Sequence, residues 1–129
     1  DKYGIFVDEQ TAETFDYIVT KLNNYSLAYI HLTRPWQIIE SPDFIKDVIG
    51  HYRNIYKGFL IANGNYGVAD AVMEIKTNRA DAIAFGRLFI SNPDLPERFE
   101  HHWPLRNPDP ATFYTSGPVG YTDYPKYQT

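Results

Sequence analysis

The stretch Gly58–Gly86, GFLIANGNYGVADAVMEIKTNRADAIAFG, carries the pattern that decides the fold. It opens with one short apolar run, GFLIAN, and closes with another, DAIAFG. Between these runs, apolar residues recur at the spacing of one helix face: Val68, Ala71, Val72 and Ile75. The stretch therefore predicts a strand, a helix and a second strand.

The same alternation runs through the sequence upstream. In TAETFDYIVTKLNN, Thr11 is a candidate helix cap and the apolar face is Phe15, Ile18, Val19 and Leu22. The short apolar run Leu27–Leu32, LAYIHL, predicts a buried strand. In SPDFIKDVIGHYRN, Ser41 as cap and Pro42 at the first helical position predict another helix, with a buried face of Phe44, Ile45, Val48, Ile49 and Tyr52.

Strands that alternate with amphipathic helices predict an α/β fold with a parallel sheet. Parallel strands are covered on both faces, which agrees with apolar runs that do not alternate with polar residues. Three strands are too few to close a barrel, and they leave two outer edges that favour association. We therefore expect this sheet to be part of a larger one.

Composition excludes several classes of partner. The chain has 129 residues, of which 43% are hydrophobic and 22% charged, so it is expected to fold around one core. The net charge of -4 provides no basic surface for nucleic acid. No apolar run approaches the ~20 residues of a membrane-spanning helix. We expect neither a nucleic-acid nor a membrane partner.

The sequence has no cysteine, which agrees with a reducing compartment, and we expect a cytoplasmic location. The chain opens on Asp1 without a charged and apolar leader, which indicates a piece of a longer protein. After Phe99 the periodicity ends. Residues 100–129 are rich in proline, glycine and aromatic residues, and we expect an irregular C-terminal tail that packs on a surface.

The loops that follow the apolar runs are the candidate binding elements, because ligands bind at the carboxyl ends of parallel strands. NGNYG contains Gly64 and Asn65, residues that tolerate positive φ and let backbone N–H groups converge on an anion. The next loop brings Gly86, which has no side chain to block a ligand, and Arg87, whose planar fork suits phosphate. The alternative is a plain turn with a helix cap and an ordinary surface arginine.

The histidines suggest no metal site. His31 lies within a predicted strand, where a packed and hydrogen-bonded core histidine is expected. His51 falls on a helix, and His101 and His102 open the tail. None of them forms a metal-ligand spacing with a carboxylate, so no metal is assigned.

Four segments carry a family resemblance: AYIHL, GFLIANGNYG, ADAIAFGRLFISNPDLPERF and TFYTSGPVGYTDYP. In this order and spacing they resemble the C-terminal part of the old yellow enzyme family of FMN-dependent ene-reductases, from Tyr3 onward. The resemblance implies that residues 1–129 are the C-terminal segment of one TIM-barrel domain, a (β/α)8 barrel. The segment would contain the last three strands and helices, in residues 1–99, and the tail.

The same resemblance implies site residues. Gly64 and Asn65, with Gly86 and Arg87, would hold the FMN phosphate through backbone amides and a guanidinium. Tyr114 would lie on the substrate side of the flavin. Many members carry a glutamate where this sequence has Arg34, and no role is assigned to Trp36 in the loop that follows.

The family's catalytic groups do not belong to this stretch: the His-x-x-Asn or His-x-x-His pair, the tyrosine proton donor and the arginine near the flavin pyrimidine. No catalytic residue is therefore assigned. The implied function is reduction of activated C=C bonds, in α,β-unsaturated carbonyl or nitro compounds, with NAD(P)H. The implied partner is the N-terminal part of the same barrel, as a separate chain or a clipped segment. The alternatives are a phosphate-binding TIM barrel of another class and a non-catalytic partial-barrel scaffold.

Overall fold

The structure is a computed structural model that describes residues 8–35 and 44–128. Ser41, Pro42 and Trp36 lie outside the described residues. The chain divides into two compact units, Asp1–Ala84 and Phe85–Thr129. Each unit has its own buried side chains.

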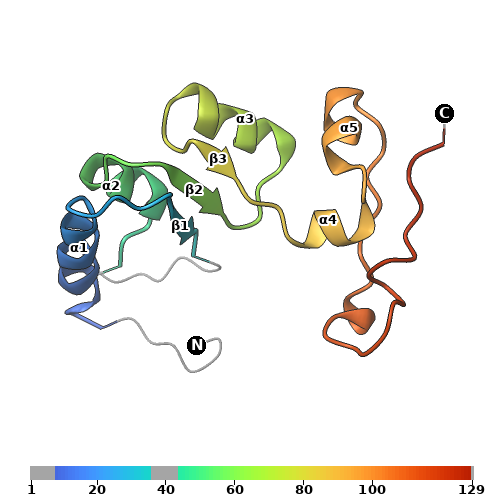
Figure 1. Ribbon diagram of the computed structural model, residues 1–129, viewed down its shortest axis with the longest axis horizontal. Helices are drawn as coiled ribbons and strands as arrows, with labels where there is room; N and C mark the ends of the chain where they lie inside the picture. The colour runs from blue at the N-terminus through green and yellow to red at the C-terminus, as the bar shows by residue number, and fades with distance from the viewer. Residues whose placement is uncertain (1–7, 36–43, 129) are drawn as a thin grey trace. The chain divides into compact units, whose positions relative to one another are not determined.

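The first unit alternates helices and strands (Figure 1). Its elements are α1 (Thr11–Leu22), β1 (Ile30–Thr33), α2 (Val48–Ile55), β2 (Leu60–Asn63), α3 (Val68–Lys76) and β3 (Ala82–Ile83). The three strands form a parallel sheet in the order β1-β2-β3. The order of elements and the parallel sheet are therefore as predicted from the sequence.

The register of the sheet brings the carboxyl ends of its strands together. Ile30 pairs with Leu60 at one end of β1, and Thr33 pairs with Asn63 at the other. On the far side of β2, Ile61 pairs with Ala82. The loop after β1 and the loop after β2 therefore start at the same edge of the sheet.

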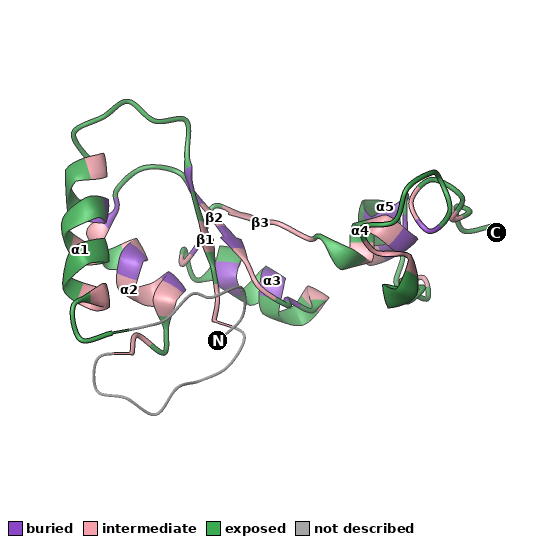
Figure 2. Ribbon diagram, turned by 90° about the horizontal axis from the view of Figure 1, so that it is seen from below, coloured by how far each residue is buried: buried purple, intermediate pink, exposed green. Residues whose placement is uncertain are grey.

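The core of this unit lies around the central strand (Figure 2). Leu60 and Ala62 of β2 are completely buried, and α2 adds Ile49 and Tyr52. Helix α2 lies against β1, and α3 lies against β3. Burying a large apolar side chain contributes about 1.5–3 kcal/mol, so these buried residues of β2 and α2 help to stabilise the unit.

Two helix starts differ from the prediction. The cap of α1 is Gln10, and Thr11 is the first helical residue. The Thr11 hydroxyl donates to Oδ1 of Asp8 at 2.7 Å and does not cap the helix. Helix α2 begins only at Val48, since the Asp47 carboxylate accepts from the Gly50 amide at 3.1 Å and caps the helix there. The predicted buried residues Phe44 and Ile45 therefore precede the helix.

The predicted apolar faces are only partly covered. On α1, Val19 is buried, whereas Phe15 is 51% and Ile18 42% exposed. On α3, Ala71 is buried together with Glu74, while Val72 and Ile75 are exposed. Among the described elements, α2 lies beside α1 and β3 lies beside α3, and these neighbours cover only part of each apolar stripe.

His31 also differs from the prediction. It lies in β1, but its side chain is exposed, so it is no core histidine. The reason is that a strand side chain points to one face of the sheet, and the face that carries His31 is not covered at this position.

The second unit contains α4 (Arg87–Ser91), α5 (Leu95–Glu100) and the short 3-10 helix η1 (Pro110–Thr112). Its interior is largely polar. The buried Asn92 side chain donates to the Leu88 carbonyl at 2.8 Å and the Arg106 carbonyl at 2.9 Å, and it accepts from the Arg106 amide at 2.8 Å. Asn92 thus ends α4 and fixes the start of the tail.

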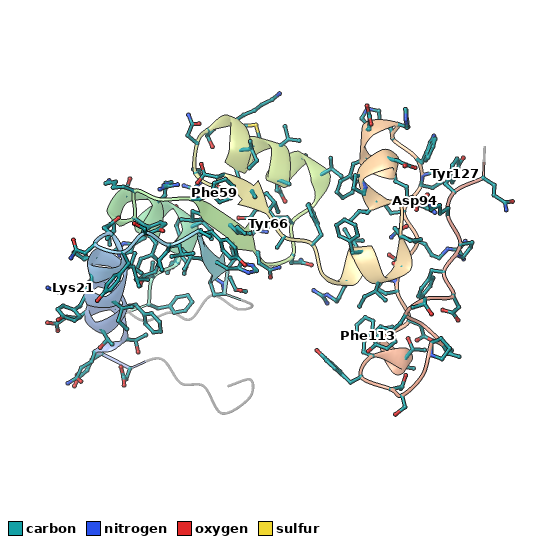
Figure 3. The ribbon with its side chains drawn as sticks, viewed as in Figure 1. Lys21, Phe59, Tyr66, Asp94, Phe113 and Tyr127 are labelled. Atoms are coloured by element: carbon teal, nitrogen blue, oxygen red, sulfur yellow. The ribbon has the colours of Figure 1, made fainter. Side chains whose placement is uncertain are left out.

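A buried ion pair continues this network. Arg98 donates through Nε to Asp94 at 2.6 Å and through Nη1 to the Pro104 carbonyl at 2.7 Å. Asp94 also accepts from the Tyr127 amide at 2.7 Å; both residues are labelled in Figure 3. Burial works to raise the pKa of Asp94, but the hydrogen bonds from Tyr127 and Arg98 outweigh it and hold the pKa below its usual range.

No described helix has the length and hydropathy needed to cross a bilayer.

Candidate functional site

The loop after β2 has the backbone conformation that its sequence predicts. Gly64 has a φ of 117° and Asn65 a φ of 55°, so two successive residues are left-handed. Gly67 then caps α3 in an extended conformation. Backbone amides of a turn that leads into a helix N-terminus can form a concavity that binds anions.

Gly64 must be glycine for a second reason. A Cβ built on it would lie 2.8 Å from Cβ and 2.9 Å from the backbone nitrogen of Arg34. The chain that leaves β1 thus passes directly against this loop.

From this position, the Arg34 side chain donates hydrogen bonds to the loop after β2. Its Nε and Nη2 donate to the Gly64 carbonyl at 2.9 and 2.7 Å, and Nη2 also donates to the Asn65 carbonyl at 3.2 Å. Its guanidinium carbon lies 3.6 Å from the centre of the Tyr66 ring. From the sequence, Arg34 is noted only as a difference from the family pattern, and its contacts with this loop are not predicted.

Tyr66, labelled in Figure 3, contacts Arg34 through its ring and Glu74 through its hydroxyl. Its buried hydroxyl donates to Oε1 of Glu74 at 3.1 Å. Burial, followed by the negative charge of Glu74, raises the pKa of this hydroxyl, which stays protonated as a donor. Glu74 in turn accepts from Nε of Arg79 at 2.7 Å.

Arg79 joins this chain of contacts to α2. It donates through Nη1 and Nη2 to the Asp47 carboxylate at 3.0 and 2.6 Å. The hydrogen bond from Arg79 is the main cause that holds the pKa of Asp47 below its usual range. Side chains from four parts of the first unit therefore connect the loop after β2 to the cap of α2.

The other predicted phosphate residues lie in the second unit. Gly86 is the cap of α4, and a Cβ built on it would meet nothing within 4 Å. Arg87 is the first residue of α4, and it is exposed. The two predicted phosphate-binding pairs therefore lie in different units. Gly64 and Asn65 belong to the first unit, and Gly86 and Arg87 belong to the second.

Tyr114 lies in the tail with an exposed side chain. It has a φ of 62°, and the side chain is 92% exposed. Its amide donates to the hydroxyl of Tyr121, and this bond anchors the backbone while the ring is exposed. Among the described residues, no group of three or more histidine, aspartate or glutamate side chains could hold a metal ion.

Comparison with known proteins identifies the family. Residues 1–106 match the NADH:flavin oxidoreductase / NADH oxidase family. The chain belongs to this family. Among its relatives, the 12-oxophytodienoate reductase-like protein of Solanum lycopersicum is 39% identical, over 97% of this chain and 36% of that protein. A putative 12-oxophytodienoate reductase of Oryza sativa is 41% identical, over 84% of this chain and 30% of that protein.

Solved structures of the flavin oxidoreductases confirm the fold. Morphinone reductase in complex with tetrahydroNAD superposes with a TM-score of 0.80 at 41% identity, over 94% of this chain and 32% of that one. The old yellow enzyme from Trypanosoma cruzi superposes with a TM-score of 0.84 at 40% identity, over 94% and 31%. The chain spans about a third of the length of these relatives. The resemblance to old yellow enzymes and the partial TIM barrel are therefore confirmed.

Proposed function

We propose that this chain supplies the phosphate-binding end of the flavin site in an FMN-dependent ene-reductase. The observation that carries the proposal is the loop after β2, in which left-handed Gly64 and Asn65 lead into the N-terminus of α3. Such a loop fits a terminal phosphate, because backbone amides and the helix dipole both favour negative charge. Family membership supports FMN as the molecule that carries the phosphate.

In this proposal, Gly64 and Asn65 present backbone amides to the phosphate. Gly86 leaves room for the ligand, and Arg87 adds a charge-assisted contact. The open space beyond Gly86 and the exposure of Arg87 support these roles. The exposed ring of Tyr114 supports a place on the substrate side of the flavin. When bound, FMN supplies the hydride chemistry, while the protein supplies position and charge.

The rest of the barrel must come from another segment. The sheet ends at β1 and β3, and α1 and α3 expose apolar side chains. Both features support the N-terminal part of the same barrel as partner, as a separate chain or a clipped segment. We propose that residues 1–99 and the tail at 100–129 are the end of one TIM-barrel domain.

The substrate class is part of the proposal. The relatives include proteins named 12-oxophytodienoate reductase and morphinone reductase, and these names support a reductase activity. We propose that the complete barrel reduces activated C=C bonds in α,β-unsaturated carbonyl compounds, or in nitro compounds, with NAD(P)H. The catalytic groups for the substrate would come from the N-terminal part. The absence of cysteine supports a cytoplasmic location.

The test uses the complete barrel, meaning this chain combined with the N-terminal part of a relative such as morphinone reductase. We expect a yellow protein that binds FMN more tightly than riboflavin, which lacks the phosphate. It should reduce 2-cyclohexenone with NADPH or NADH. A folded complete barrel that binds no flavin would support the scaffold alternative instead, and phosphate binding without flavin binding would support a barrel of another class.

A further inference from the structure

Arg34 and the residues that it contacts all belong to the first unit. The residue directly follows β1, and its backbone amide extends the ladder by donating to the Asn63 carbonyl at 2.8 Å. Its side chain then donates to the carbonyls of the next two residues, Gly64 and Asn65, at 2.7 to 3.2 Å. Arg34 thus donates to three successive carbonyls, the last one of β2 and the first two of the loop that follows.

These contacts orient the amides of the loop. In a trans peptide, the carbonyl and the N–H of the same unit point in opposite directions. The Gly64 carbonyl shares its peptide unit with the Asn65 amide, and the Asn65 carbonyl shares its unit with the Tyr66 amide. Because Arg34 holds both carbonyls, both amides point away from the guanidinium and toward the other side of the loop.

The guanidinium is also held in place from one face. It stacks on the Tyr66 ring at 3.6 Å, and Tyr66 is only 5% exposed. The Tyr66 hydroxyl is fixed by Glu74, which Arg79 binds in turn. Lysine could not replace Arg34, because an ammonium has neither the planar face for the ring nor the fork for two carbonyls.

We propose that Arg34 is a positioning residue that shapes the loop for the terminal phosphate of the flavin nucleotide. This inference rests on the proposed function. Arg34 acts through the two carbonyls that it holds, and it makes no contact with the phosphate.

The test compares FMN with riboflavin in the complete barrel, by quenching of flavin fluorescence. Arg34→Gln should weaken FMN binding by about tenfold, since hydrogen bonds to a charged donor contribute about 1.5 kcal/mol or more and 1.4 kcal/mol is one decade. Riboflavin binding should stay within about twofold, because riboflavin has no phosphate for the loop to hold. Arg34→Lys should resemble Arg34→Gln, since lysine keeps the charge but not the fork.

Arg53 offers a matched control. It also donates to two main-chain carbonyls, those of Tyr56 and Gly58, but it does so before β2 begins. Arg53→Gln should lower the melting temperature and leave the ratio of FMN to riboflavin affinity unchanged. That result separates a local effect on the loop from general destabilisation.

The remaining outcomes distinguish the two proposals. If the unmodified barrel binds FMN no more tightly than riboflavin, the phosphate site itself is wrong, and the role of Arg34 falls with it. If the unmodified barrel prefers FMN and Arg34→Gln keeps the full preference, only the role of Arg34 is overturned. An equal loss of both ligands, or full recovery by Arg34→Lys, would also overturn it, in favour of a structural role or a direct charge effect.

Discussion

At the scale of the single residue, two glycines of one short loop differ in whether their position requires glycine. Gly64 is left-handed and lies against Arg34, whereas Gly67 has a φ of -83° and its nearest potential Cβ contact, with Asp70, is 3.9 Å away. Both look alike in NGNYG, because the sequence shows neither φ nor the neighbouring chain. Of these two positions, only that of Gly64 requires glycine, because of its backbone conformation and its close neighbour.

We expect Gly64→Ala to lower the free energy of unfolding of the complete barrel by at least about 2 kcal/mol, from the left-handed backbone and from overpacking against Arg34. Gly67→Ala should cost at most about 1 kcal/mol, because only the quality of the helix cap changes. Urea unfolding of both variants measures the difference. Equal losses would contradict the close approach of Arg34.

Arg87 provides the other prediction at this scale. If it contacts the phosphate, Arg87→Ala should weaken FMN binding roughly 10- to 150-fold, since a charge-assisted hydrogen bond contributes roughly 1.5 to 3 kcal/mol. Arg87→Lys should recover part of the loss. The exposed Arg106 of the same unit is the control, and its replacement by alanine should leave FMN affinity unchanged. Equal affinities for the unmodified barrel and Arg87→Ala would remove Arg87 from the site.

At the scale of the secondary-structure element, the start of α2 depends on a single side chain, that of Asp47. Pro42 suggested the start of a helix, but α2 begins at Val48, where the Asp47 carboxylate both caps the helix and binds Arg79. Arg79 follows α3, 32 residues further along the chain. No local pattern could have identified that partner, because the sheet brings the two residues together.

This pair predicts a dependence of stability on pH. The pKa of Asp47 is lowered in the folded state, so its contribution is present at neutral pH and is lost as the pH falls through the folded-state value. Asp47→Asn keeps a side chain that caps equally well but removes the charge. We expect the variant to be less stable at pH 7, with a difference that shrinks below about pH 4. Urea midpoints across this range measure it, and a constant difference would exclude the ion pair as the cause.

At the scale of the whole molecule, the apolar surface indicates an incomplete fold. Helix α1 exposes Phe15, Tyr17 and Ile18, and helix α3 exposes Val72, Met73 and Ile75. A chain that covers about a third of its relatives presents surface that their remaining segments could cover. The outer strands β1 and β3 add open edges to this surface.

We therefore expect residues 1–129 in isolation to be largely unfolded or aggregated. Addition of the N-terminal part of the barrel should increase the helical circular dichroism signal and produce a cooperative thermal transition. Size-exclusion chromatography with thermal melts distinguishes the states. A cooperative transition of the isolated monomer would show that the two units need no partner.

The sequence by itself determined the order of helices and strands, the parallel sheet and the left-handed loop at Gly64 and Asn65. These features are local, since they depend on apolar spacing and on residues that tolerate positive φ. Tertiary structure alone decided that Arg34 holds this loop, that Asp47 binds Arg79, and that His31 is exposed. Each of these depends on which segments lie side by side and on what covers each face of the sheet, and neighbours distant in sequence leave no periodic signal in the chain.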